Sequence, residues 1–441
     1  MSSALSVPPV ATGPLPDDRR SLARSAALLS AAWIAANAAS YLLSVVGSRK
    51  LGPVGYGQLG PMLAVVAVVS VPGLALQAVI ARRTARREID ARHCVTLGTA
   101  VGAACAAAAL ALLPLLSGFL HLGAAAAGLA AALAFALPQA VLSAAQGRLQ
   151  GANRFAALSV LVLGAGAARL FGGVVPLLLG ADAQDTMLGV LVATAVVAAI
   201  AAGLTVGRGR QPSPRRRSGL RGLGWREVGM ATCALGGLLL LSNMDLLLAR
   251  HLLGADRSGH YAAGAVISRV ALWLPQAVSL TVLPRLTDAR IRRSALRDAA
   301  IATAAVGVVS VAVVAVAGGP LTVLAFGHAY RSLGGVAWMF AAQGGALAIV
   351  QLLIVDDIAR ARRGTFPILV GAAIAESAAL ELVHPETVGG IAVVAMLTAA
   401  ATAFAASARS VRDSAPDRDQ WPASSHVRPT PTETSRSTSS L

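Results

Sequence analysis

Long apolar runs alternate with short polar turns along almost the whole chain. A helix needs about 20 apolar residues to cross the hydrocarbon core of a bilayer, and such runs recur from residue 22 to residue 408. We therefore predict an all-α polytopic membrane protein with about twelve transmembrane helices. Their expected ranges are 22–47, 57–81, 93–116, 123–145, 155–179, 186–206, 228–249, 259–284, 298–318, 333–355, 365–384 and 388–408.

The charged turns predict the orientation of these helices. Every second turn is rich in Arg, starting with the turn after the second helix and including the stretch RGRQPSPRRRSGLRGLGWRE. The turns in between are poor in basic residues, apart from Arg49, Lys50, Arg250, Arg257 and Arg331. Because Lys and Arg gather in cytoplasmic turns, we expect both termini in the cytoplasm.

Two stretches of the chain repeat each other at a nearly constant distance. SRKLGPVGYGQL (48–59) matches ARHLLGADRSGHY (249–261), and the offset of about 202 residues persists over the following helix. The repeat predicts two six-helix bundles of the same orientation, as in transporters built from parallel repeats. The predicted segments are a cytoplasmic N-terminal segment (1–21), a first bundle (22–206), a basic linker (207–227), a second bundle (228–408) and a disordered cytoplasmic tail (409–441).

The repeated stretches are interpreted as matched turns on the outer face. Glycine suits tight backbone turns, so we assign that role to Gly52, Gly57, Gly254 and Gly259. Arg49 and Arg250 match at an offset of 201 residues, and both depart from the orientation rule. We assign this pair to the architecture and to an outer gate. His121, His260 and His328 fall on outer turns and are interpreted as solvated.

Composition narrows the class of protein further. The chain is 56% hydrophobic and only 13% charged. Soluble proteins have about 25% charged residues, so the charged fraction here is far below theirs. Its net charge of +17 is spread over separate turns, so nucleic acid is not the expected partner. The three cysteines show neither metal-ligand nor disulfide spacing. With no nucleotide-binding loop, no cofactor is predicted. The excess of Arg, Gly and Ala is typical of a high-GC bacterial genome.

The order of these features resembles one transporter group. RKLGPVGYGQL followed by a helix ending in ARR, and the stretch AAQGRLQGANRFAAL, are similar to segments of bacterial polysaccharide flippases. NMDLLLARHLLGADRSGHYAAGAVISRVALWLPQAVSLTVLPRL resembles the start of their second half. These proteins belong to the multidrug, oligosaccharidyl-lipid and polysaccharide exporter superfamily. The resemblance covers about residues 25 to 405 and carries no catalytic signature. It implies a non-enzymatic exporter in the cell membrane, with membrane lipids and other polysaccharide-assembly proteins as partners.

The same resemblance implies a substrate, an oligosaccharide on a polyprenyl pyrophosphate that moves from the cytoplasmic to the outer leaflet. Charges inside a bilayer are costly and mark candidate sites. Guanidinium groups pair well with phosphate, so the expected substrate-binding residues are Arg169, Arg269 and Arg24, joined by the polar Asn37 and Gln276.

Other roles for the intramembrane charges stay open. Asp245 and Arg269 can form a structural ion pair between neighbouring helices, and Arg24 can reach the membrane interface. The polar amides and hydroxyls can hold helices together instead of binding sugar. Glu376 is a candidate for coupling transport to protons.

Three other functions compete with the flippase. A multidrug antiporter of the same superfamily is the main alternative, although aromatic residues make up only 4% of the chain and the expected cavity charges are Arg. A lipid II flippase would typically have fourteen helices. A membrane-embedded sugar ligase or polymerase would need a large outer loop, and every outer loop here is short.

Overall fold

The computed structural model describes residues 16–207, 225–275, 292–359 and 365–412, and the regular elements in these ranges are all helices. The α-helices are α1 (Pro16–Val69), α2 (Val71–Ala85), α3 (Ala91–Ala111), α4 (Leu113–Phe119), α5 (Ala126–Ala134), α6 (Ala136–Gly151), α7 (Phe155–Leu178), α8 (Ala183–Gly207), α9 (Trp225–Leu252), α10 (Ala255–Trp273), α12 (Arg292–Phe326), α13 (Ala337–Ala359), α14 (Thr365–Val383) and α15 (Val388–Arg412). Two short 3₁₀ segments, η1 (Gly123–Ala125) and η3 (His328–Gly335), precede α5 and α13.

The first helix is two membrane crossings joined by a sharp bend. Gly52 has φ 64° and ψ −177°, a conformation that suits glycine, and Pro53 begins the returning segment. The returning segment continues to Val69 and, after a break at Ser70, into α2, which has Pro72 in its first turn. The turn expected between the first two helices, 22–47 and 57–81, is therefore only the bend at Gly52. The second crossing is longer than expected and is interrupted at Ser70.

Twelve crossings result within the described residues, as predicted. Nine helical stretches there are long and apolar enough to span a membrane, and the first of them contains the bend at Gly52. The 28-residue α9 and the 19-residue α10 supply the others. The expected eleventh helix is continuous from Thr365 to Val383 in spite of Glu376 and Glu381.

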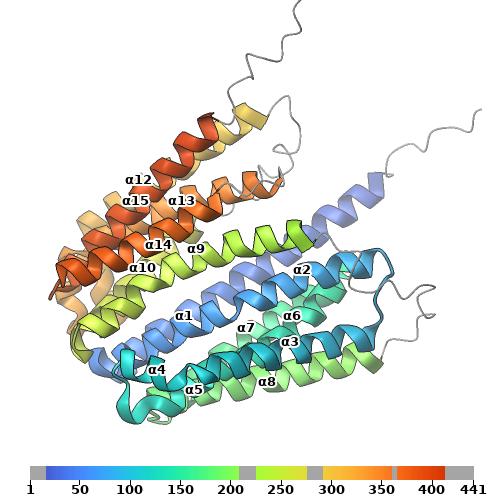
Figure 1. The fold of residues 1–441 in the computed structure, drawn as a ribbon, viewed down its shortest axis with the longest axis horizontal. Coiled ribbons are helices and arrows are strands. Elements are labelled where there is room, and N and C mark those ends of the chain that lie inside the picture. The colour runs from blue at the N-terminus through green and yellow to red at the C-terminus, as the bar shows by residue number, and fades with distance from the viewer. Residues whose placement is uncertain (1–15, 208–224, 276–291, 360–364, 413–441) are drawn as a thin grey trace, which may run out of the picture.

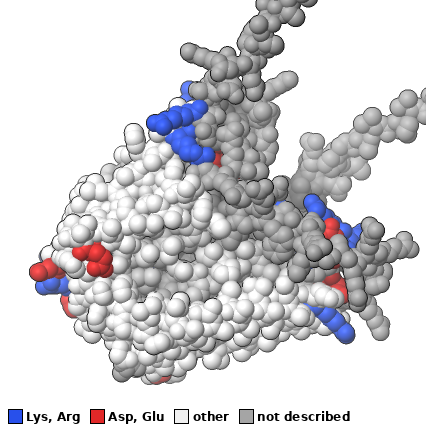
Figure 2. Space-filling model, in the orientation of Figure 1, with Lys and Arg blue, Asp and Glu red and all other residues white. Residues whose placement is uncertain are grey.

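The charged side chains gather at the two ends of the helices. In Figure 2 the Lys, Arg, Asp and Glu residues on the visible face lie mainly near these ends, and the surface between them is uncharged. We call the end that contains the Gly52 bend the Gly52 end, and the opposite end the arginine end. The turn from Arg86 to Asp90 and the turn before α7 lie at the arginine end. Its position in the cytoplasm stays a prediction.

The two halves repeat the same packing. In the first half α1 packs against α7, both α2 and α3 pack against α6, and α7 packs against α8. In the second half α9 packs against α14, both α10 and α12 pack against α13, and α14 packs against α15. Figure 1 shows α1 to α8 (blue to green) on one side and α12 to α15 (yellow to red) on the other. The repeat seen in the sequence is therefore a repeat of structure.

The halves meet along their first two crossings. α1 packs against α10 and α9, and α2 packs against α9. Tyr56 and Leu59 of the first half share a buried core cluster with Leu246, Tyr261 and Phe340 of the second. Because lipid tails are as apolar as these side chains, close packing and hydrogen bonds hold the halves together. The predicted linker, 207–227, falls almost wholly outside the described residues.

Candidate functional site

The interface between the halves is tightest where α1 crosses α10. Gly57 and Gly259, which match in the repeat, face each other there. A Cβ atom on Gly259 would overlap the carbonyl oxygen of Pro53, and a Cβ atom on Gly57 would overlap that of Ala255. One turn further along, a Cβ atom on Gly60 would lie 2.6 Å from the Cβ of Ala262. Small residues are required here because the two backbones touch.

These contacts change the roles predicted for the four glycines. Gly52 forms the turn, as expected, and Gly254 precedes the first residue of α10. Gly57 and Gly259 lie inside helices, so the prediction that they form turns was wrong. Their repetition reflects contact between the halves.

Arg49 and Arg250 each reach across to the opposite half at the Gly52 end. The Nε of Arg49 donates to the Ala325 carbonyl at 2.8 Å, and its Nη2 donates to the Leu324 carbonyl. The Nε of Arg250 donates to Leu120 O at 2.9 Å, and its Nη2 donates to His121 O at 3.0 Å. Arg49 is exposed, whereas Arg250 is only 5% exposed.

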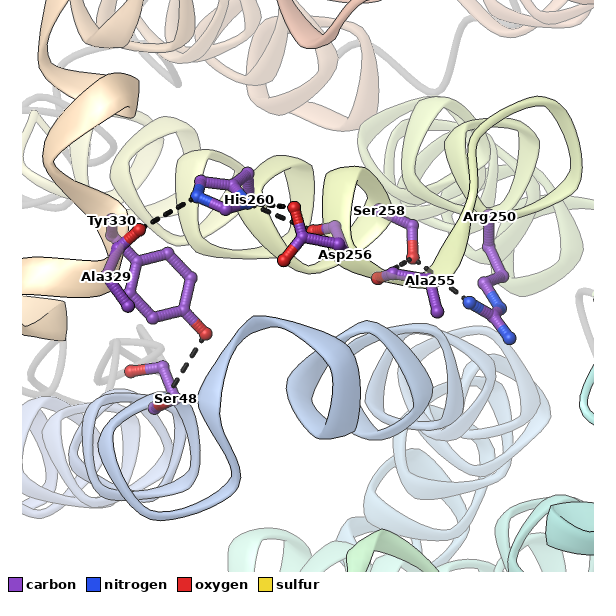
Figure 3. A network of polar contacts seen from close by, with 8 residues as sticks. All are labelled: Ser48, Arg250, Ala255, Asp256, Ser258, His260, Ala329 and Tyr330. Carbon is purple, nitrogen blue, oxygen red and sulfur yellow. Dashed lines mark hydrogen bonds and ion pairs between the residues drawn. The ribbon is translucent and has the colours of Figure 1, made fainter.

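Weaker polar contacts surround these arginines. Figure 3 shows α10 beside both α1 and η3, with Arg250 beside Ser258 and Tyr330 beside Ser48. The Tyr330 hydroxyl donates to Ser48 O at 3.3 Å. Burial raises the pKa of the Tyr330 phenol well above its usual value, so the hydroxyl keeps its proton and remains a donor.

Three histidines at this end make hydrogen bonds or ring contacts that the sequence did not predict. The His251 ring stacks on Phe119 with centroids 4.1 Å apart, and its Nδ1 donates to the Phe119 carbonyl at 2.8 Å. His121 stacks on the same imidazole at 5.4 Å. His260 bonds Asp256 O and Ala329 O, each at 3.0 Å, which corrects its interpretation as a solvated loop residue.

Arg269 lies on α10 at the interface between the halves. It is partly buried, and its Nη2 donates to the side-chain oxygen of Asn243 on α9 at 2.7 Å. It is also close enough to the Tyr41 hydroxyl of α1 to interact electrostatically with it. Among the described residues no carboxylate forms an ion pair with it, and the Asp245 carboxyl lies within electrostatic range of it.

Arg169 is held inside the first half. Its Nη2 donates to Oε1 of Gln139 at 2.6 Å, and its guanidinium lies 5.4 Å from the centre of the Phe135 ring. The buried Nε has no hydrogen-bond partner in the described part of the chain. Arg169 and Arg269 therefore come from opposite halves, and each is fixed by a neutral amide.

The carboxylates of Asp245 and Glu376 are both buried inside the second half. Oδ2 of Asp245 accepts hydrogen bonds from the Tyr261 hydroxyl and from Nε2 of Gln343, both at 2.8 Å. The Glu376 carboxyl, 1% exposed, lies within electrostatic range of Asp245, and its Oε1 has no partner among the described residues. The ion pair between Asp245 and Arg269, which the sequence left open, is absent from the described residues, because Asp245 bonds Tyr261 and Gln343 instead.

The remaining candidates are only partly placed. Asn37 is half-buried on α1, one helical turn before Tyr41. Arg24 belongs to α1, but its side chain lies outside the described residues, and so does Gln276.

Asn243, Tyr261 and Ser258 were not singled out from the sequence. A signal for the last existed, since Ser258 directly precedes the repeated Gly259. The other two carry no distinguishing pattern in the sequence.

Solved structures with this arrangement of helices are transporters by name. The chain is similar to a MATE protein crystallised in complex with MaL6, with a TM-score of 0.62 and 12% identity over 88% of this chain and 95% of that chain. It is similar to a MOP superfamily transporter from Pyrococcus furiosus, described as having a binding pocket of reversed polarity, with a TM-score of 0.61 and 15% identity over the same shares of the two chains.

A third similar structure is the outward-facing conformation of a multidrug resistance MATE family transporter, with a TM-score of 0.60 and 15% identity over 88% of this chain and 95% of that one. No protein-family model matches the sequence, and no curated protein matches it either. At these identities the likeness concerns the fold, which is the two-bundle fold predicted from the repeat.

Proposed function

We propose that this protein is an alternating-access membrane transporter that moves a polyprenyl-pyrophosphate-linked oligosaccharide from the cytoplasmic to the outer leaflet. Two structurally equivalent six-helix halves that meet along α1, α2, α9 and α10 support the transport mechanism, because such halves can rock about a central site. Transport of this kind needs no catalytic chemistry. A multi-pass position in a bacterial cell membrane, beside other polysaccharide-assembly proteins, belongs to the same proposal.

The observation that carries the substrate class is Arg269. It lies on the interface between the halves, it is partly exposed, and its hydrogen-bond partner is the neutral Asn243. A guanidinium binds phosphate through two parallel hydrogen bonds and stays charged at working pH. A pyrophosphate passing between the halves would therefore find a fixed positive charge on its path.

The buried carboxylates of the second half are proposed to couple transport to a proton gradient. Asp245 and Glu376 lie within electrostatic range of each other, and no arginine forms an ion pair with either among the described residues. Intramembrane carboxyl groups of this kind are typical of proton relays. The Asp245 carboxyl also lies within electrostatic range of Arg269, so the proposed coupling site and the proposed substrate site are close enough to influence each other.

A multidrug antiporter remains the second candidate, and the same carboxylates favour it. A buried acid can bind a drug cation as well as a proton, and one of the similar structures is a multidrug resistance transporter by name. The two functions differ in the sign of the substrate charge. An anionic substrate requires Arg269, whereas a cationic drug requires Asp245 or Glu376.

Deletion of the gene in its native host separates these functions. The flippase proposal predicts that polyprenyl-linked oligosaccharide accumulates in the cytoplasmic leaflet, where impermeant glycosidases cannot reach it in intact cells. Complementation with the intact gene should return the lipid to its normal level. An unchanged lipid pool together with increased sensitivity to cationic drugs would contradict the flippase and support the antiporter.

A further inference from the structure

We propose that Arg49 and Arg250 form a reciprocal lock that holds the Gly52 end closed and must break for this end to open. The lock consists of Arg49 with the carbonyls of Leu324 and Ala325, and Arg250 with the carbonyls of Leu120 and His121. It rests on the alternating-access part of the proposed function and is independent of the substrate.

The two contacts are equivalent by the internal repeat. Arg49 and Arg250 lie 201 residues apart, at the ends of the first crossings of the two halves. Their acceptors lie 204 residues apart, Leu120 matching Leu324 and His121 matching Ala325. Each arginine thus binds the end of the third crossing of the other half, so that one half is tied to the other twice.

The acceptors explain why the contacts favour a positive charge. Leu120 follows the last residue of α4, and Leu324 and Ala325 lie in the last turn of α12. The last carbonyls of a helix lack partners within it and carry partial negative charge. An arginine placed there donates hydrogen bonds to those carbonyls, and its positive charge is stabilised by their partial negative charge.

The chemistry of the lock also makes it reversible. Both guanidiniums bind carbonyls at a helix terminus, and none of the described carboxylates forms an ion pair with either of them. Water can replace these partners when the end opens, because the contacts lie at a charged end of the molecule and not in its apolar belt (Figure 2).

Other hydrogen bonds join the two halves close to the lock. Tyr330 to Ser48, Ser258 to Gly57, and His251 to Phe119 each join the two halves at the Gly52 end. Figure 3 shows the first of these contacts beside α10. Together with the Gly57 and Gly259 crossing, they join the two halves at several points of the Gly52 end.

Arg257 provides a matched control at the same end. It is exposed, and its Nη1 donates to Glu386 O at 2.7 Å. Donor and acceptor both belong to the second half, so this bond does not resist separation of the halves. Replacing Arg257 removes a charge and a carbonyl contact like those of Arg49, without touching the lock.

The test measures the distance between the halves directly. Spin labels on Leu179 and Leu382, equivalent positions that are each 83% exposed, report the separation of the halves at the Gly52 end. A second pair, Leu115 and Leu179, lies within the first half and reports its integrity. The labels are placed in the full chain with its three cysteines replaced by alanine, reconstituted in liposomes, and read by double electron–electron resonance.

The lock predicts that Arg49→Gln raises the ratio of open to closed populations about tenfold, and Arg250→Gln at least as much, as expected for losing hydrogen bonds to a charged group. The effects should multiply in the double variant, because the two contacts share no partner. Arg257→Gln should match the unaltered protein.

Two results would overturn the lock. One is an unchanged distance between the halves in Arg49→Gln. Because Arg49 is exposed, misfolding of this variant would not explain that result. The other is an equal change in the Leu115–Leu179 reference pair, which would indicate a general structural role. Since the distances are read without substrate, failure of the flippase assay would leave this result standing.

Discussion

Gln139 and Gln343 occupy equivalent positions in the two halves but bind side chains of opposite charge. They lie 204 residues apart; Gln139 accepts a hydrogen bond from Arg169, and Gln343 donates one to Asp245. The same scaffold position therefore holds a cation in one half and an anion in the other. This asymmetry agrees with the proposal that arginines bind an anionic substrate while carboxylates bind a coupling proton.

The first prediction concerns Arg269. Replacing it with alanine removes the charge from the interface, and we expect the rate of lipid-linked oligosaccharide translocation to fall by about tenfold to a hundredfold. Arg269→Lys should retain part of the rate, because it keeps the charge but loses the bidentate geometry. Arg257→Ala is the control. Equal rates for Arg269→Ala and this control would remove Arg269 from the substrate path.

The second prediction concerns Glu376. Glu376→Gln keeps the size of a 1% exposed side chain but removes its ability to release a proton. We expect transport in liposomes to lose its acceleration by an imposed proton gradient, with uptake at zero gradient largely retained. Glu381→Gln, in the same helix but exposed, should behave like the unaltered protein. A preserved gradient dependence in Glu376→Gln would exclude this carboxyl as the coupling site.

At the scale of the element, hydropathy predicted where helices exist better than where they break. The turn at Gly52 was visible because glycine and proline interrupt an apolar run. The breaks at Ser70 and Phe135 were not, because the apolar run continues through them. Gly57 and Gly259 were assigned to turns because a single sequence does not distinguish a glycine at a helix crossing from a glycine in a turn.

The third prediction tests the helix crossing. Gly259→Ala places a methyl group against the Pro53 carbonyl, and overpacking of this kind typically costs about 1–3 kcal/mol. We expect a lower Tm in detergent and a weaker contact between α1 and α10. Gly254→Ala has no atom within 4 Å of the added methyl group and should change Tm far less. Equal Tm values would indicate that the backbones do not touch here.

At the scale of the whole molecule, the twelve crossings and the two equivalent halves followed from the spacing of apolar runs and from one repeat offset. The contacts between the halves did not. Arg49 was recognised as half of a matched pair, but its acceptors are backbone carbonyls 275 and 276 residues away, which no side-chain pattern reveals. An ion pair of Asp245 with Arg269 was one alternative because the two residues lie on adjacent helices, whereas packing directs Asp245 to Tyr261 and Gln343.

Transport of an anionic lipid-linked glycan across the bilayer by the two halves is the main function proposed for this protein. Its most direct test is reconstitution in liposomes with a fluorescent polyprenyl-pyrophosphate oligosaccharide on the inner leaflet, followed by its exposure to an impermeant quencher. We expect quenching to proceed with the unaltered protein and to slow by about tenfold to a hundredfold with Arg269→Ala. Quenching no faster than in protein-free liposomes, while the same vesicles transport a cationic drug, would contradict it.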